Sequence, residues 1–265
     1  MMSESHMGAL RTVGTGDQEG GTVGDLAYSR IREDILFGRL APGERMPLDA
    51  VGQRYHASVS TMRELLSRLT SEGLIVAEGQ RGFSVAPVSP AEFREVGALR
   101  LLLETHAMTE SFAAGDLDWE GQVVAAHHKL SVMEARMIEQ ADADPTVWKQ
   151  CDRAFHHALI AACGSTMLMA THSAVYDKYL RYQMVAVIFR GAAAAREHGQ
   201  LLDCALHRDA ARANEILRRH IQSCVDFALS EEASNWSGGA SPAGTASGVA
   251  TPRSGGSRVA STKRR

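Results

Sequence analysis

The sequence lacks several features that would place it in other protein classes. No apolar run approaches the ~20 residues that cross a bilayer, which excludes a membrane-spanning helix. The first 24 residues have neither an apolar segment nor a basic start, so they are not a secretory signal. The four cysteines form no C-x-x-C pair and no dense framework, so we expect reduced thiols inside the helices of a cytoplasmic protein.

A chain of 265 residues, 45% of them hydrophobic and only 6% aromatic, has room for two modest domains rich in leucine and alanine. The composition turns to Gly, Ser and Thr near the start and to Gly, Ser, Ala, Pro and Thr near the end, which is typical of disorder. We therefore predict a disordered N-terminus (1–24), an N-terminal domain (25–88), an all-helical domain (89–231) and a disordered basic tail (232–265).

The N-terminal domain has the element order of a winged helix-turn-helix. Apolar spacing predicts helices over Ala27–Phe37 and Leu48–Tyr55, and a third over Ser58–Leu69 that begins with capping hydroxyls. The runs Ile75–Ala77 and Phe83–Val85 predict a hairpin, the wing. This fold places its third helix in the major groove of DNA. The alternative is a helical subdomain that touches no DNA.

The second domain has an almost continuous helical pattern. Ser89 and Pro90 suit the N-cap and first turn of its first helix, and residues with turn chemistry separate six segments. The fold class expected for the chain is therefore mainly α: a winged helix-turn-helix followed by an all-α bundle of about six helices. The predicted helices are Ala91–Ala114, Asp118–Gln140, Thr146–Cys163, Thr166–Phe189, Ala193–Leu206 and Asp209–Ser230.

The net charge of −3 is a weak objection to DNA binding, because only a local basic surface is needed. The N-terminal domain carries eight arginines and eight acidic residues, so phosphate contacts require Arg54, Arg63, Arg68 and Arg81 to share one face. The basic residues of Arg253–Arg265 could add nonspecific DNA affinity, although a solvated, disordered end is the plainer interpretation.

Four side chains of the second domain are spaced as a metal site. Asp152 and His156 are four residues apart on one predicted helix, and His198 and His220 lie on the fifth and sixth helices of the bundle. One carboxylate and three imidazoles without a thiolate suit Zn²⁺, Ni²⁺, Mn²⁺ or Fe²⁺. Because the chain has eleven histidines, an accidental combination is the alternative.

Arg100 lies in a mostly apolar stretch of the first bundle helix. A buried guanidinium needs an anion or an exit to solvent, and its fork suits a carboxylate. Arg100 is therefore a candidate effector-binding residue. The alternative is an ion pair with Glu104, one helical turn further on.

Four motifs follow one another in the first domain: Ala41-Pro42-Gly43-Glu44, Ser58–Leu69 with Arg63-Glu64, Glu72-Gly73-Leu74 and Arg81–Pro87. On these motifs the chain resembles the GntR family of bacterial transcription regulators over about Asp25–Leu229, and its second domain is similar to the FCD ligand-binding domain of the FadR subgroup. A narrower likeness, at Gly115–Glu120 and Val123–Leu130, is to repressors of dicarboxylate catabolism, such as that of glutarate.

The resemblance implies a homodimer that binds a two-fold DNA operator as a repressor and responds to a small carboxylate effector. Most relatives have an arginine where this chain has Val59, so Arg63 becomes the main candidate for reading a guanine, and the preferred operator should differ. The expected DNA contacts are Ser58, Ser60, Thr61 and Arg63 in the helix, and Gln80, Arg81 and Gly82 in the wing.

Metal-binding FCD domains carry an Asp-x-x-x-His pair that ends in Phe-His, a Glu-His on a later helix and a His near the end of the last helix. The matches here are Asp152 with Phe155-His156, Glu197-His198 and Arg219-His220, so the resemblance implies the same four ligands. It also implies that Arg100 meets the effector's carboxylate. His157 should point about 100° away from His156 and not ligate, and His172 is treated as ordinary.

Two other functions remain open at this point. A metal sensor would use the same fold with the ion itself as effector. A metal-dependent enzyme is the weaker alternative, because the chain has no H-E-x-x-H, no G-x-S-x-G and no evident general base; we expect no enzymatic activity.

Overall fold

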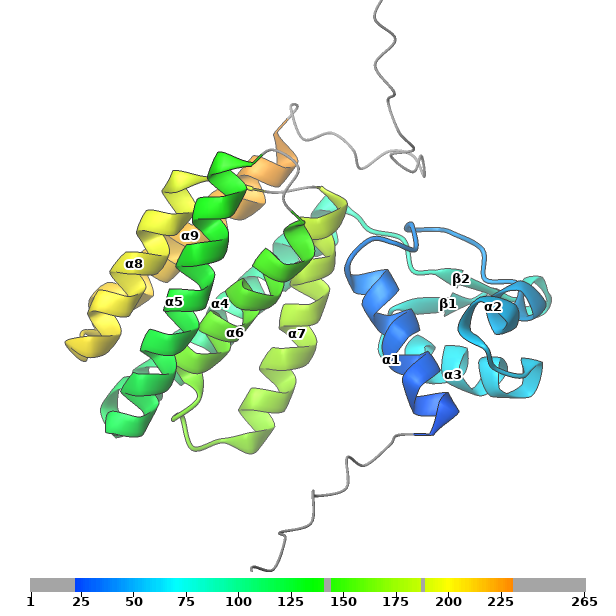
Figure 1. The fold of residues 1–265 in the computed structure, drawn as a ribbon, viewed down its shortest axis with the longest axis horizontal. Helices are drawn as coiled ribbons and strands as arrows, with labels where there is room; N and C mark the ends of the chain where they lie inside the picture. The colour runs from blue at the N-terminus through cyan, green and yellow to red at the C-terminus, as the bar shows by residue number, and fades with distance from the viewer. Residues whose placement is uncertain (1–21, 141–143, 187–188, 231–265) are drawn as a thin grey trace, which may run out of the picture.

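The computed structural model describes residues 22–140, 144–186 and 189–230, with the side chain of Gln80 excepted. Figure 1 shows a helical bundle on one side and a smaller domain with a two-stranded sheet on the other, with α7 facing α1. The predicted fold class, a winged helix-turn-helix followed by a six-helix bundle, is confirmed. Nowhere in these ranges does a helix combine the length and apolar character needed to cross a bilayer.

The smaller domain packs three helices and a hairpin around one apolar core. Its strands pair antiparallel, with Ile75 opposite Val85. Ile31, Ile35 and Leu66 lie fully inside this core, which confirms the helical spacing of the first and third helices. The elements are α1 (Val23–Leu36), α2 (Leu48–Tyr55), α3 (Val59–Ser71), β1 (Ile75–Ala77), the 3₁₀ turn η1 (Gly79–Arg81) and β2 (Phe83–Val85).

The first helix begins earlier than predicted. Thr22 and Asp25 form a capping box, in which Thr22 Oγ1 accepts from the Asp25 amide and the Asp25 carboxylate accepts from the Thr22 amide. The prediction of disorder for 1–24 is therefore wrong at Val23 and Gly24. Residues 1–21 and 231–265 lie outside the described residues, and the predicted basic tail (232–265) falls in the second of these ranges.

The turn between α2 and α3 fixes how α3 is presented. A Cβ on Gly52 would lie 2.7 Å from the carbonyl oxygen of Ala57, so only glycine lets the turn come this close to α2. His56 ends α2 in the left-handed conformation, at φ 56°. Ser58 then caps α3, its Oγ accepting from the Thr61 amide at 3.2 Å.

Six helices form the bundle, and Ser89 caps the first of them as predicted. Two predicted helices end early: α6 stops at Ile160 rather than Cys163, because the chain tightens into a turn that leads to Gly164 at φ 71°, and α7 stops at Val185 rather than Phe189. The bounds are α4 (Pro90–Ala114), α5 (Leu117–Glu139), α6 (Pro145–Ile160), α7 (Thr166–Val185), α8 (Ala192–Leu206) and α9 (Ala210–Leu229).

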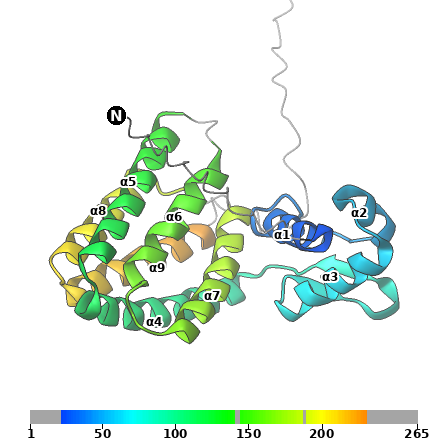
Figure 2. The same cartoon turned by 60° about the horizontal axis from the view of Figure 1, so that its bottom comes forward.

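The two domains meet along α7, as Figures 1 and 2 both show. Asp177 on α7 forms ion pairs with Arg32 of α1 and, at 2.9 Å, with Arg153 of α6. Arg181, one turn further along α7, donates to the carbonyl oxygen of Ala86 in the segment that leaves the wing. One face of α7 therefore holds the DNA-binding domain, while Tyr176, next to Asp177, is buried inside the bundle.

Candidate metal centre and nucleic-acid interface

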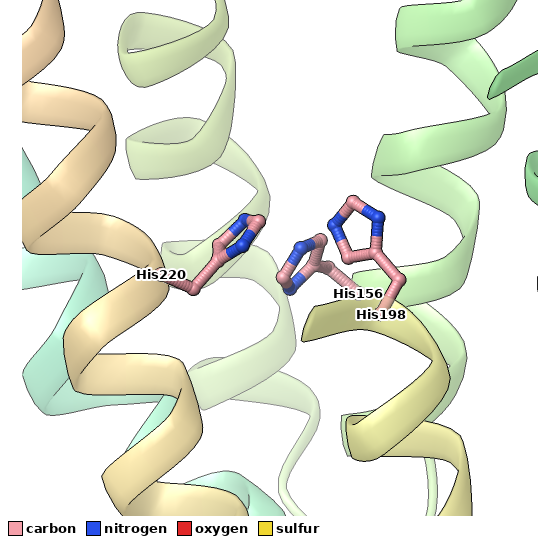
Figure 3. Close-up of side chains that lie close together, drawn as sticks. All are labelled: His156, His198 and His220. Carbon is pink, nitrogen blue, oxygen red and sulfur yellow. The ribbon is translucent and has the colours of Figure 1, made fainter. Parts of the chain in front are cut away.

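Three of the four predicted metal ligands converge in the bundle core. His156 of α6, His198 of α8 and His220 of α9 are all buried and offer ring nitrogens within 4.8 Å of one another. Figure 3 shows the three rings close together, each from a different helix. Since separate helices bring them together, the cluster is a product of the tertiary fold.

Each imidazole is held by a carboxylate at its Nδ1 atom. The distances are 3.2 Å from His156 to Glu104, 2.6 Å from His198 to Glu134 and 2.8 Å from His220 to Glu197. An ionised carboxylate only accepts, which favours a proton on Nδ1 and the lone pair on Nε2 in His156 and His198. Nδ1 of His220 also lies 3.1 Å from Nη2 of Arg190, a donor, so two opposing neighbours act on its proton. Carboxylates orient metal-binding histidines in the same way.

Asp152, the fourth predicted ligand, lies beside one of the three rings. Its Oδ1 lies 3.3 Å from Nε2 of His198, which makes no hydrogen bond in the described structure. When the His198 proton is on Nδ1, these two atoms are both acceptors, and a cation between them would satisfy both. Ligands about 2.0–2.2 Å from a tetrahedral zinc lie roughly 3.3–3.6 Å apart, so the spacing fits a metal ion.

The other oxygen of Asp152, Oδ2, has two hydrogen-bond donors. It accepts from the Tyr176 hydroxyl at 2.8 Å and from the Lys149 ammonium at 3.4 Å. Burial raises the pKa of the Asp152 carboxyl, but Lys149, the two neighbouring histidines and Arg100 together outweigh burial, and the net pKa is well below the ordinary value. Asp152 is therefore an anion at neutral pH, as a metal ligand must be.

Burial also sets the state of the histidines. It lowers the pKa of His156 to about 4, assisted by the positive charge of Arg100. Burial likewise lowers the pKa of His220 well below its usual range, although Glu197 opposes the shift. Both rings are thus neutral at pH 7, with lone pairs free to bind a metal ion.

This state makes the metal-free protein sensitive to acid. An unfolded His156 takes up a proton near pH 6.5, whereas the folded one resists it down to about pH 4, so stability present above pH 6.5 is lost as pH falls through that window. We expect the melting temperature of chelator-treated protein to fall between pH 6.5 and 4.5, and His156→Gln to fall less steeply. Equal slopes for the two proteins would contradict this assignment.

Arg100 is completely buried beside the metal cluster. Its Nε and Nη2 atoms donate to Glu104 at 2.8 and 3.3 Å, and its guanidinium lies over the rings of Tyr176 and Tyr179. The ion pair that was the alternative to effector binding is therefore formed. Nη1 nevertheless has no partner among the described residues, which leaves a buried donor for an anionic ligand.

Several residues of the site were missed from the sequence. Glu104 joins Arg100 and His156 and also accepts from Nε2 of His172 at 2.7 Å. His172, for which the sequence predicts no role, is thus a buried partner of Glu104 but not a member of the metal cluster. Glu134 follows buried Leu130 by four residues, a position on the apolar stripe of α5. A carboxylate at a position of the helix that faces the core, as in both glutamates, was the sequence signal that could have identified them. His157 is exposed and does not join the cluster, as predicted.

The predicted DNA-reading residues lie together at the start of α3. Ser58 and Ser60 are exposed, Thr61 is half-buried, and Ser58 Oγ lies 2.8 Å from the hydroxyls of both. Arg63 is exposed one turn further on, and Val59, which stands in the place of the expected arginine, is 42% exposed.

The wing places Arg81 at an exposed end of η1, followed by Gly82 at φ 91°; the side chain of Gln80 lies outside the described part. Not all arginines of the domain are free for phosphate: Arg54 pairs with Asp34 at 3.3 Å, and Arg68 stacks over Tyr28. Arg63 and Arg81 are left as the main exposed cations of the reading surface.

Comparison with known proteins assigns both domains. The bacterial regulatory proteins of the GntR family match residues 25–85, and the FCD domain matches residues 95–223. The HTH-type transcriptional regulator BphR of Paraburkholderia xenovorans is 37% identical over 203 residues, 76% of this chain and 83% of BphR. The transcriptional repressor GlaR of Escherichia coli is 29% identical over 214 residues, 78% of this chain and 96% of GlaR.

Solved structures share the fold. Escherichia coli McbR/YncC superposes with a TM-score of 0.65 at 17% identity, over 78% of this chain and 97% of that protein. A GntR-type regulator from Rhodococcus sp. RHA1 gives 0.65 at 19% identity, over 79% and 98%. The matching families and relatives are transcription regulators, not enzymes. This chain belongs to the GntR family of bacterial transcription regulators and carries the FCD domain that is typical of the FadR subgroup.

Proposed function

We propose that this regulator is a ligand-responsive repressor whose bundle binds one divalent metal ion and one small carboxylate. The observation that carries the proposal is the contact of Asp152 Oδ1 with His198 Nε2, 3.3 Å apart, beside a buried cluster of three imidazoles. Asp152, His156, His198 and His220 would hold the ion. Zinc suits this set best, and nickel, manganese or iron(II) also accept it.

The buried charges around the metal cluster favour an anionic effector. The acidic and basic side chains other than histidine that contact the cluster or its carboxylates, and that are at most 4% exposed, are two cations, Arg100 and Lys149, and three carboxylates, Glu104, Glu134 and Asp152. Their net charge of −1 would become +1 with a bound divalent ion. A carboxylate that binds the metal, with Arg100 Nη1 donating to a second carboxylate or hydroxyl, would then balance the buried charge.

The rest of the mechanism follows from the two-domain structure. Effector binding in the bundle would favour one arrangement of the two winged helices over another, and α7 would pass the change from one domain to the other. The change in operator affinity can be no larger than the difference in effector affinity between the two arrangements. A homodimer on a two-fold operator is the expected assembly, in the cytoplasm. Repression is supported by the likeness to the Escherichia coli repressor GlaR.

The test is a metal analysis followed by a ligand screen on the purified protein. We expect about one equivalent of metal per chain, and a small mono- or dicarboxylate that raises the melting temperature only when metal is present. If DNA binding responds to metal and none of the carboxylates has an effect, the metal-sensor alternative is favoured. The same four ligands suffice for such a sensor. Metal-free protein that binds no added divalent ion would contradict the proposal.

Arg100→Lys tests the effector contact. Lysine keeps the charge beside Glu104 but loses the planar fork, so we expect metal content to be retained and the acid-induced melting shift to be lost or strongly reduced. Arg94→Lys, at an exposed position on the same helix, is the matched control. An unchanged acid response in Arg100→Lys would leave Arg100 with only its ion-pair role.

A further inference from the structure

One buried cation beside the metal cluster contacts Asp152 but is neither a metal ligand nor an effector contact of the proposed site. Lys149 on α6 is 3% exposed, and its ammonium lies over the ring of Trp148, 4.0 Å from the centroid. Among the described residues it makes one hydrogen bond, to Asp152 Oδ2 at 3.4 Å. An ammonium has three donors, and burying a charge with a single acceptor is costly, so its position calls for an explanation.

Asp152 divides its two oxygens between two partners. Oδ1 faces Nε2 of His198 at 3.3 Å, the direction in which a metal ion would bind. Oδ2 is occupied by Lys149 and by the hydroxyl of Tyr176. Lys149 is therefore a buried positive charge on the carboxylate oxygen that does not face His198 in this contact.

We propose that Lys149 sets the metal affinity of this site by competing with the ion for the charge of Asp152. In metal-free protein the ammonium compensates the buried carboxylate, so this state is stabilised. When a divalent ion binds, the same ammonium becomes a nearby like charge and opposes it. Both effects weaken metal binding. The bound ion can therefore exchange with free metal ions in solution, and the occupancy of the site can follow their concentration. The inference rests on the proposed metal site.

A purely structural role predicts the opposite result. If Lys149 only held Asp152 in place for the metal, its removal would let the carboxylate move and metal binding would weaken. If Lys149 competes with the metal, its removal strengthens binding. The sign of the change in zinc affinity therefore separates the two roles.

The experiment measures zinc affinity of full-length protein by competition with a chromophoric chelator. Lys149→Met keeps the apolar stem over Trp148 and removes the charge, and we expect about tenfold tighter zinc binding with a lower melting temperature only in the metal-free state. Lys149→Arg keeps the charge and should stay near wild type. Lys129→Met, at an exposed position on α5, is the control for loss of a surface lysine.

Lys149→Gln is a second neutral variant, which keeps the test valid if Lys149→Met fails to fold. Its amide keeps a donor for Asp152 without the charge, and we expect it also to bind zinc more tightly than wild type. Unchanged or weaker zinc binding in both neutral variants would overturn the role of Lys149 while leaving the metal site intact. Wild-type protein that binds no zinc, nickel, manganese or iron would instead overturn the proposed function, and with it this inference.

Discussion

Arg63→Ala is expected to abolish specific operator binding while the protein stays folded. Arg63 is exposed near the start of α3, so its truncation leaves the apolar face of that helix untouched. A bidentate arginine–guanine contact contributes about 1–3 kcal/mol of discrimination. The proposed dimer would make two such contacts, so the expected loss is about 2–6 kcal/mol, or roughly 30-fold to more than 10⁴-fold in affinity.

The effect should be this large because the chain has few substitutes for Arg63. Val59 takes the position where an arginine is expected, Arg68 is stacked on Tyr28, and Arg54 is paired with Asp34. These contacts leave Arg63 as the exposed arginine of α3 for base reading. The preferred operator should accordingly differ from that of relatives that carry the second arginine.

The measurement is fluorescence anisotropy on an operator that the wild-type protein selects from a random-sequence pool. Binding to unrelated DNA should fall much less than operator binding, because phosphate contacts elsewhere remain. Arg94→Ala, exposed on α4 away from the reading surface, is the control and should bind like wild type. Near-wild-type operator affinity in Arg63→Ala would remove α3 from its role as the reading helix.

The winged helix was predictable because its signals are local. The strands Ile75–Ala77 and Phe83–Val85 and the helix Leu48–Tyr55 have the predicted bounds, since period and turn chemistry decide them within a few residues. The start of α1 was missed because the capping box at Thr22 lies in a stretch whose composition indicates disorder. A prediction from composition averages residue types over a window, so it does not detect a single helix-capping residue.

The metal cluster was only partly predictable, for a different reason. Asp152 and His156 are one helical turn apart, so the sequence alone places them on one face. Nothing local shows that Glu134, 64 residues before His198, would orient that ring, or that Glu104 would join Arg100, His156 and His172. Such contacts depend on how helices pack, which spacing within one helix does not determine.

His198→Ala should remove the metal from the bundle. The substitution deletes the nitrogen that faces Asp152 and leaves Glu134 buried without its imidazole partner. Loss of an outer carboxylate partner costs about 10–100-fold in metal affinity, so loss of the ligand itself should cost more than about 100-fold. We expect metal-free protein after purification, and no rise in melting temperature when zinc is added.

Two further variants turn this prediction into a graded series. Glu134→Gln keeps an oxygen near His198 Nδ1 but removes the charge, so zinc affinity should fall by about 10–100-fold and remain measurable. His157→Ala changes a histidine that is exposed although it adjoins His156, and it should bind zinc like wild type. A metal held by the cluster requires this order of affinities, because only the buried rings share the space around Asp152. Equal zinc affinity in all three variants would show that the metal binds elsewhere. The proposed response to an effector could then not depend on a metal ion in this cluster.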